Sequence, residues 1–128
     1  MSAVRQFRRQ QSTHARGRAA EAVGVSWLER QGLRVKARNF RTKAGEIDVV
    51  GADADTLVFI EIKARSTRAF GPASTAVPPT KQRRIARAAA LYLTRHPHSG
   101  PCRFDVLAMD RVEDGWSYDW IRDAFDAS

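Results

Sequence analysis

The chain has 128 residues, of which 43% are hydrophobic and 28% charged, and its formal net charge is +8 at pH 7. This length favours one domain with a single layered core, and no apolar run reaches the ~20 residues that a membrane span needs, which excludes a membrane protein. No apolar stretch follows the arginines of the amino terminus, so a secretory signal is also excluded. Because the lone Cys102 cannot form an internal disulfide, we expect a protein of the reducing cytoplasm.

The positive charge indicates an anionic partner. Lys and Arg number 22 against 14 Asp and Glu, and nucleic acid, most plausibly DNA, is the leading partner for such a balance. Arginine also binds phosphate through two parallel hydrogen bonds. An arginine excess that reflects genomic base composition is a compatible alternative.

The amino-terminal part predicts an arm followed by a helix. Residues 1–12 are expected to form a disordered basic arm, and residues 13–128 the single domain. Residues 13–31 have a helical pattern in which Glu21 lies among small and apolar positions, so its carboxylate faces the core or a site. On this pattern alone, an ion pair with an arginine explains Glu21 as well as a site does.

Residues 33–40 predict a half-exposed strand with a basic face, because apolar and basic residues alternate. Arg38 lies on that strand, and Arg41 continues the charge into the next turn. The two interpretations are a solvated surface and a phosphate track leading to a site. The pattern does not choose between them.

Four charged residues, Glu46, Asp48, Glu61 and Lys63, are set into two otherwise apolar strands at residues 45–50 and 57–63. An antiparallel hairpin closed by residues 53–56 places Val50 opposite Phe59, Asp48 opposite Glu61, and Glu46 opposite Lys63, so four charged groups share one face.

Two carboxylates at adjacent positions of a buried hairpin repel each other, and a divalent cation with oxygen ligands, by default Mg²⁺, relieves that repulsion. Lys63 beside such a cation would orient or activate a water molecule. These groups are the ones that phosphodiester hydrolysis requires, because a metal neutralises the charge that develops on phosphoryl oxygens.

The connection after Lys63 is long and rich in small residues. Since it leaves the strand that carries Glu61, it could fold over a substrate as a flap, with Arg65 and Arg68 on phosphates. An inert loop is the alternative.

A second helix is predicted over residues 81–95, capped by Thr80 and ended by His96 and Pro97. Lys81 lies on the inward side of its first turn, where a helix amino terminus already favours phosphate. The alternative is a lysine whose stem packs on apolar surface.

The last elements are a strand at residues 103–110 and a terminal strand or helix at residues 116–125 that closes one edge. Asp105 either supports the site or pairs with Arg103, and the structural role is the simpler interpretation for a single acid near the start of a strand.

Asp48, followed thirteen positions later by Glu61-Ile62-Lys63, resembles the core motif of the PD-(D/E)xK nuclease superfamily, with Ile47 in place of the proline. A wider set of residues is similar to the YraN-like family of small bacterial proteins, over a span from about residue 17 to about residue 125. That set is Gly45-Glu46-Ile47-Asp48, Phe59-Ile60-Glu61-Ile62-Lys63-Ala64-Arg65, Phe70-Gly71, Lys81 and Arg103-Phe104-Asp105-Val106.

The resemblance implies an α/β fold with a restriction-endonuclease-like three-layer α/β/α core, a mixed sheet and the order αβββαβ plus a terminal element. The fold would lie near that of the archaeal Holliday-junction resolvases. The implied activity is Mg²⁺-dependent cleavage of DNA, with Mn²⁺ as a substitute and branched, recombination or repair intermediates as candidate substrates.

The implied metal ligands are Asp48, Glu61, the main-chain carbonyl of Ile62 and, directly or through water, Glu21. Lys81 would assist with the substrate, and a lysine recurs at this position in the family pattern.

Three functional alternatives stay open at this point. The chain is an endonuclease, a non-catalytic nucleic-acid-binding module that keeps the nuclease fold, or a subunit that acts only within a complex. Glu46 would tune the charge of Lys63 in the proposed register. Symmetric cleavage of a junction would require a homodimer.

Overall fold

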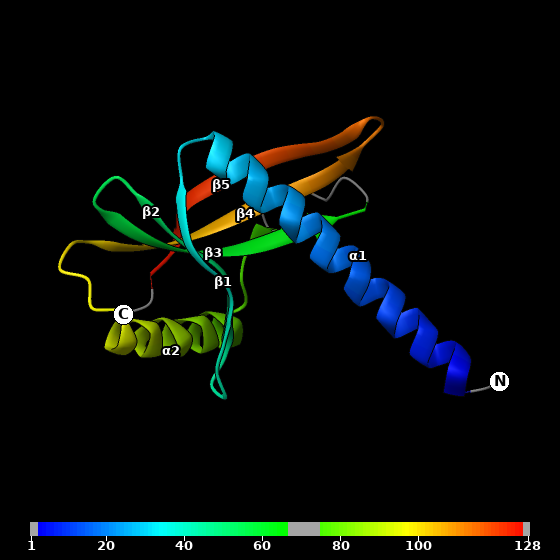
Figure 1. Cartoon of the computed structure of the whole chain (residues 1–128), viewed down its shortest axis with the longest axis horizontal. Helices are drawn as coiled ribbons and strands as arrows, with labels where there is room; N and C mark the ends of the chain where they lie inside the picture. The colour runs from blue at the N-terminus through cyan, green and yellow to red at the C-terminus, as the bar shows by residue number, and fades with distance from the viewer. Residues whose placement is uncertain (1–2, 67–74, 127–128) are drawn as a thin grey trace.

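The computed structural model describes the backbone of residues 3–66 and 75–126, and within these ranges the side chains from residue 17 onward. Two helices and five strands follow one another along the chain (Figure 1). They are α1 (Ala3–Arg30), β1 (Arg34–Arg41), β2 (Glu46–Asp53), β3 (Thr56–Arg65), α2 (Pro79–Arg95), β4 (Cys102–Val112) and β5 (Gly115–Phe125). The strands form one sheet in the order β1-β2-β3-β4-β5, in which β3 and β4 are parallel and every other pair is antiparallel.

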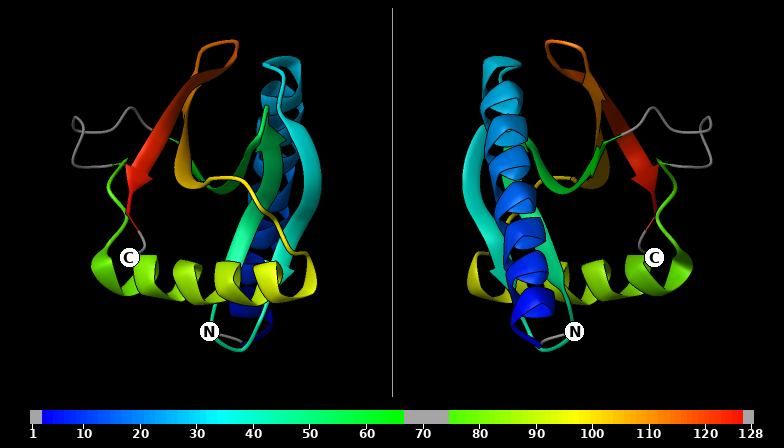
Figure 2. Two further views of the ribbon diagram at one scale, coloured as in Figure 1. Left: turned by 90° about the vertical axis from the view of Figure 1, so that its left-hand side faces the viewer. Right: turned by 90° about the vertical axis from the view of Figure 1, so that its right-hand side faces the viewer.

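The helices lie on opposite faces of the sheet, as the side views show (Figure 2). On the α1 face, Val25 and Leu28 pack with Val58 and Ile60 of β3. On the α2 face, four residues of α2 pack in a cluster with Phe59 and Val106. The alternation of the strand residues thus divides the core into two layers. The predicted α/β class, its three layers, its mixed sheet and its element order are confirmed, and the terminal element is an edge strand.

The β2–β3 hairpin follows the predicted register only near its turn. Val50 lies opposite Phe59 and Ala52 opposite Leu57, but the ladder ends at Val49 and Ile60. The expected direct pairs of Asp48 with Glu61 and of Glu46 with Lys63 are therefore wrong.

The reason is a side chain that replaces a main-chain acceptor. Asp48 Oδ2 accepts a hydrogen bond of 2.8 Å from the Ile62 N–H, so the strands part where the sequence predicted a continuous ladder. On the other side of β2, Asn39 has a positive φ of 51° at the position facing Asp48.

Both helices begin earlier than expected. Helix α1 starts at Ala3, so residues 3–12 are helical where the sequence predicted a disordered arm, and this part extends beyond the sheet (Figure 1). Residues 3–16 contain neither Gly nor Pro and are rich in Arg, Gln and Ala, which have high or intermediate helix propensity. In α2 the cap is Pro78, not Thr80. Pro79 takes the first helical position, where its fixed backbone angle suits a helix, and no side chain makes a capping hydrogen bond. None of the helices in the described part is long and apolar enough to cross a membrane.

Gly45 allows the β1–β2 turn to lie against α2. The Thr42 hydroxyl accepts hydrogen bonds from the N–H groups of Ala44 (3.1 Å) and Gly45 (3.0 Å) and donates one to the Gly45 carbonyl (2.9 Å). A Cβ at residue 45 would overlap the carbonyl oxygen of Arg84 and lie 2.7 Å from its carbonyl carbon. The turn and α2 therefore fix each other's position beside the site described below.

We expect Gly45→Ala to lower the free energy of unfolding by about 1–3 kcal/mol, since backbone must move to admit the methyl group. Urea denaturation measures this change. Gly17→Ala is the matched control: a Cβ there meets nothing within 4 Å, and alanine favours a helix, so stability should stay equal or rise. Equal stability of Gly45→Ala and the wild type would contradict the contact.

Candidate active site

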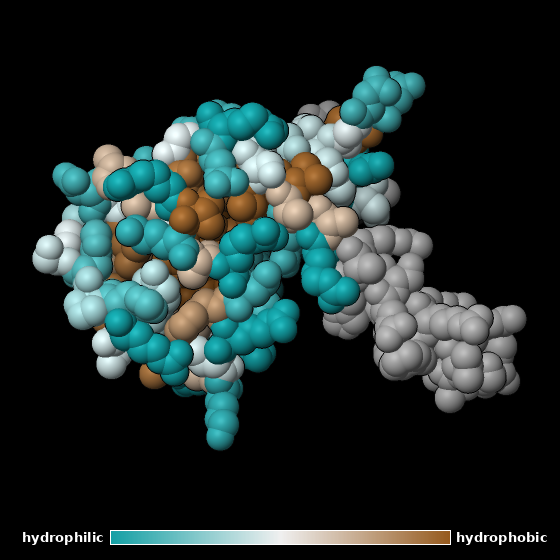
Figure 3. Space-filling model, in the orientation of Figure 1, coloured by the Kyte–Doolittle hydropathy of each residue, from teal (hydrophilic) through white to brown (hydrophobic). Residues whose placement is uncertain are grey.

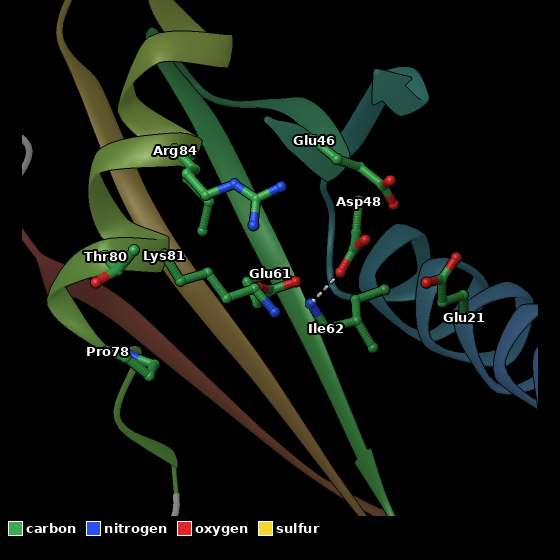
Figure 4. A pocket seen from close by; sticks show the side chains of 10 residues that line it. Glu21, Glu46, Asp48, Glu61, Ile62, Pro78, Thr80, Lys81 and Arg84 are labelled. Atoms are coloured by element: carbon green, nitrogen blue, oxygen red, sulfur yellow. Dashed lines mark hydrogen bonds and ion pairs between the residues drawn. The ribbon is translucent and has the colours of Figure 1, made fainter. Parts of the chain in front are cut away.

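A cavity of about 580 Å³ opens where β2 and β3 part, between α1 and the first turns of α2 (Figure 4). Acidic side chains come from α1 and the two strands, whereas basic side chains come from α2. The cavity is lined by Glu21, Glu46, Asp48, Glu61, Ile62, Pro78, Thr80, Lys81, Arg84 and Ile85. Three of the four predicted catalytic residues thus meet in one place.

Asp48 is the buried acid of this cavity, with 8% of its surface exposed. Burial, followed by a hydrogen bond shared with Glu61 and the charge of that carboxylate, raises the pKa of Asp48 to about 9, and the Ile62 N–H opposes the rise. The two carboxyl groups line the same cavity, and Asp48 is the one whose ionised form is disfavoured. At neutral pH the cation-free protein therefore keeps Asp48 protonated.

Glu61 is held from the other side by Lys81. The Lys81 Nζ lies 2.7 Å from Glu61 Oε2, and the exposed fractions of the two side chains are 51% and 10%. This contact is an ion pair without hydrogen-bond geometry, and within the described part of the chain the buried Oε2 has no hydrogen-bond partner. A buried carboxylate oxygen in that state is an acceptor open to a further ligand.

Glu21 faces the two carboxyl groups from α1 (Figure 4). Burial, together with the charges of Glu46 and Glu61, raises the pKa of Glu21, while Arg38 and Arg41 act in the opposite direction. Glu46 pairs with Arg41 at 3.3 Å. Among the described side chains, no three His, Cys, Asp or Glu residues gather closely enough to form a metal cage.

Two carboxylates suit one hard cation. Mg²⁺ is usually held by one or two carboxylates, with water or substrate phosphate completing its coordination, and does not require a cage made wholly of protein. Asp48 and Glu61 supply that pair, and Glu61 Oε2, which faces the Lys81 ammonium without hydrogen-bond geometry, supplies an acceptor that a cation could take over. The donor set therefore fits Mg²⁺ or Mn²⁺ and not zinc, which prefers nitrogen and sulfur ligands.

Lys63 lies beside the cavity but does not line it. Its Nζ donates a 2.6 Å hydrogen bond to the Ala76 carbonyl, in the segment that leads into α2. Burial and the nearby charge of Lys81 lower the pKa of Lys63, and Glu61 partly offsets this effect. The expected contact with Glu46 is absent because the hairpin parts before reaching these residues.

The predicted phosphate-binding arginines divide into three groups. Arg65 forms two hydrogen bonds with Asp110, at 2.7 and 2.9 Å, so an ion pair occupies it where a substrate contact was expected. Arg68 lies outside the described residues. Arg38 and Arg41 are exposed on β1, near enough to Glu21 to influence its pKa. The predicted flap also falls mostly outside the described residues, although Val77 at its end is buried in the core.

Arg84 lines the cavity, and the sequence analysis missed it. The sequence feature that could have identified Arg84 is its spacing from Lys81, because residues three apart lie on the same side of a helix. On the face shown in Figure 3, hydrophilic side chains lie along β1 and the β1–β2 turn.

Asp105 has a structural position outside the cavity. It is fully buried and pairs with Arg103 through hydrogen bonds of 2.9 Å from both Nε and Nη2. Its carboxylate also accepts hydrogen bonds from Trp120 Nε1 (2.8 Å) and from the Asp123 N–H (2.9 Å). The β4–β5 ladder is irregular here, so Asp105 supplies an acceptor that the neighbouring strand does not. The predicted alternative, a pair with Arg103, is confirmed.

The fold and the cavity together define a three-layer α/β/α protein with two carboxyl groups at a parted hairpin. The sequence model of the Uncharacterised protein family UPF0102 matches residues 20–109, and the chain belongs to this family, which confirms the YraN-like resemblance. Its relatives include UPF0102 proteins of Ralstonia nicotianae (49% identical, covering 87% of this chain and 86% of the relative), Cupriavidus necator (47%, covering 91% and 86%) and Pseudomonas putida (43%, covering 86% and 92%). These names state no activity.

Proposed function

We propose that the protein is a Mg²⁺-dependent endonuclease that hydrolyses phosphodiester bonds in DNA, with Mn²⁺ as a substitute. The observation that supports this proposal most is the meeting of Asp48 and Glu61 in one cavity, where Glu61 Oε2 has no hydrogen-bond partner among the described residues. Asp48 is kept at this point even though burial and the nearby Glu61 disfavour its ionised form. A function that requires a cation accounts for that arrangement.

Each residue has a distinct part in the proposed reaction. Asp48, Glu61 and the Ile62 carbonyl would hold the ion, with Glu21 extending the acidic wall. Bound there, Mg²⁺ supplies neutralisation of phosphoryl charge and a lower pKa for water. The Ile62 N–H fixes the orientation of Asp48 through its 2.8 Å hydrogen bond.

Basic residues of the cavity would bind the substrate. Lys81 and Arg84 lie at the first turns of α2, which carries no acidic residue. Lys63 is proposed to orient the attacking water. Its lowered pKa makes proton exchange easier, and the role requires release of the Ala76 carbonyl.

A nucleic-acid-binding module without turnover is the second candidate. Lys81 already neutralises Glu61, and Lys63 binds a main-chain carbonyl outside the cavity. Exposed basic residues on β1 and α2 support DNA binding in either case. Within the described part of the chain, Arg34, Lys36, Arg38, Arg83, Arg84 and Arg87 form no ion pair.

A substrate panel distinguishes the two candidates. Purified protein is incubated with labelled duplex, single-stranded, flapped and four-way DNA in Mg²⁺, Mn²⁺ or EDTA. We expect cleavage that requires the cation and falls by at least about a hundredfold in Glu61→Gln. Glu113→Gln is the matched control, since Glu113 is exposed outside the cavity and should leave the rate unchanged. Binding without cleavage of every substrate would favour the module.

We also propose the cytoplasm as the location, and a homodimer if the substrate is a symmetric junction. Size-exclusion chromatography with and without four-way DNA tests the dimer, because a dimer would elute at twice the mass of the 14.3 kDa chain.

A further inference from the structure

Lys81 is the cation that Glu61 holds in this structure. The 2.7 Å contact joins a carboxylate that is 10% exposed to an ammonium side chain that is 51% exposed. Glu61 is thus fixed on the sheet, whereas Lys81 reaches it from the first turn of α2 (Figure 4). The exposed partner is the one free to leave.

A divalent cation can replace Lys81 in its contact with Glu61. Because Glu61 Oε2 receives no hydrogen bond from the described residues, and the 2.7 Å contact with Lys81 lacks hydrogen-bond geometry, this contact lacks the directional component that strengthens charged pairs. A half-exposed lysine also contributes little to stability through such a pair. A divalent cation carries twice the charge and prefers carboxylate oxygen, so it competes favourably for the same oxygen.

Once released from Glu61, Lys81 would lie where a DNA phosphate can bind. It is the third residue of α2, and the amino-terminal turn of a helix attracts phosphate. Arg84 lies one turn further along the same wall of the cavity. A phosphate at this end of α2 would therefore meet one arginine always and the lysine only when Glu61 is otherwise neutralised.

We propose that Lys81 is a cation-dependent switch: it neutralises Glu61 in the cation-free protein and moves to a DNA phosphate when a divalent cation binds Glu61. This inference rests on the proposed function. It adds that cation binding creates one extra phosphate contact, so cation and DNA bind cooperatively.

The number of phosphate contacts is measurable from the salt dependence of binding. Each contact on duplex DNA steepens the plot of log affinity against log salt by about 0.9. Affinity for a fixed duplex is measured from about 50 to about 200 mM salt for the wild type, Lys81→Met and Arg84→Met, each in EDTA and in Ca²⁺. Ca²⁺ serves as the oxygen-binding cation, gels verify that the DNA stays intact, and circular dichroism verifies folding.

We expect the slopes of Lys81→Met and the wild type to agree in EDTA and to differ by about 0.9 in Ca²⁺. Over that salt range the difference amounts to about a three- to fourfold change in affinity. Arg84→Met, which removes the same charge from the same cavity, should differ from the wild type equally in both conditions.

Two results would overturn the switch. If calorimetry detects Ca²⁺ binding but the slope difference is the same with and without Ca²⁺, Lys81 does not move and the proposed function is unaffected. If neither Ca²⁺ nor Mg²⁺ binds the wild type at all, the switch and the proposed metal-dependent function both fail.

Discussion

Asp48→Asn is expected to abolish Mg²⁺-dependent cleavage and to make the cation-free protein more stable at neutral pH. Cleavage is lost because asparagine removes a charged cation ligand, at a cost of about a hundredfold in rate or more. Asparagine is preferable to alanine here, since its carbonyl can still accept the hydrogen bond that Ile62 N–H donates to Asp48. Asp48→Ala would leave that N–H without its acceptor, which offsets part of the gain in stability.

The gain in stability depends on pH with a definite sign. The pKa of Asp48 rises from 3.8 to about 9 on folding, so the folded protein keeps a proton that the unfolded chain releases. The contribution of protonated Asp48 to the free energy of unfolding is fully present below pH 3.8. It is lost as the pH rises toward 9, by at most about 1.4 kcal/mol per pH unit. Asp48→Asn lacks this loss, so its advantage over the wild type should grow with pH and reach a few kcal/mol near neutrality.

Urea denaturation in EDTA at several pH values measures this advantage. Asp119→Asn makes the same chemical change at an exposed position outside the cavity and should match the wild type throughout. Adding Mg²⁺ should stabilise the wild type and leave Asp48→Asn unchanged, because a ligand stabilises only the state that binds it. A large loss of stability with intact cleavage would exclude Asp48 from the site.

Asp105→Ala should cause a large loss of stability, about 3–5 kcal/mol. The substitution removes four hydrogen bonds at once from a fully buried carboxylate. The Arg103 guanidinium, whose pKa is raised chiefly by its hydrogen bonds with Asp105, would keep the partly exposed Asp53 as its acidic partner among the described residues. Trp120 Nε1–H and the Asp123 N–H would lose their acceptor.

Asp53→Ala is the comparison for this prediction. Asp53 contacts the same Arg103 at 3.0 Å but is 35% exposed, so its removal should cost no more than about 1 kcal/mol. Denaturant midpoints of both variants give the difference. Equal and small losses would show that Asp105 does not organise this end of the sheet, and retained cation binding by folded Asp105→Ala would separate it from the site.

The sequence predicted the layers of the fold well, because apolar periodicity assigns each face of β3 to one helix. Val58 and Ile60 pack on the α1 face, and Phe59 packs on the α2 face. The same periodicity placed Glu61 on the α2 face, where Lys81 meets it.

Alternation could not predict where the hairpin parts. A strand pattern assumes that main-chain groups pair throughout, whereas Asp48 binds the Ile62 N–H with its side chain. The contacts of Lys63 and Arg65 also escaped prediction, since their partners, Ala76 and Asp110, are distant in sequence and lie in segments whose course a pattern does not reveal. The spacing of residues along the strands therefore identified the acidic residues of the cavity. It could not identify the contacts of the basic residues, because these depend on partners elsewhere in the chain.

The most direct test of the central claim is calorimetric titration of the wild type with Mn²⁺ and Mg²⁺ in the absence of DNA. Asp48→Asn, Glu61→Gln and the exposed control Asp119→Asn are titrated in parallel. We predict saturable binding that both cavity variants lose and the control keeps, with proton release on binding near neutral pH as the cation displaces the proton held by Asp48. Binding that persists unchanged in both cavity variants, or no binding by the wild type, would contradict a cation site at this pair of acids.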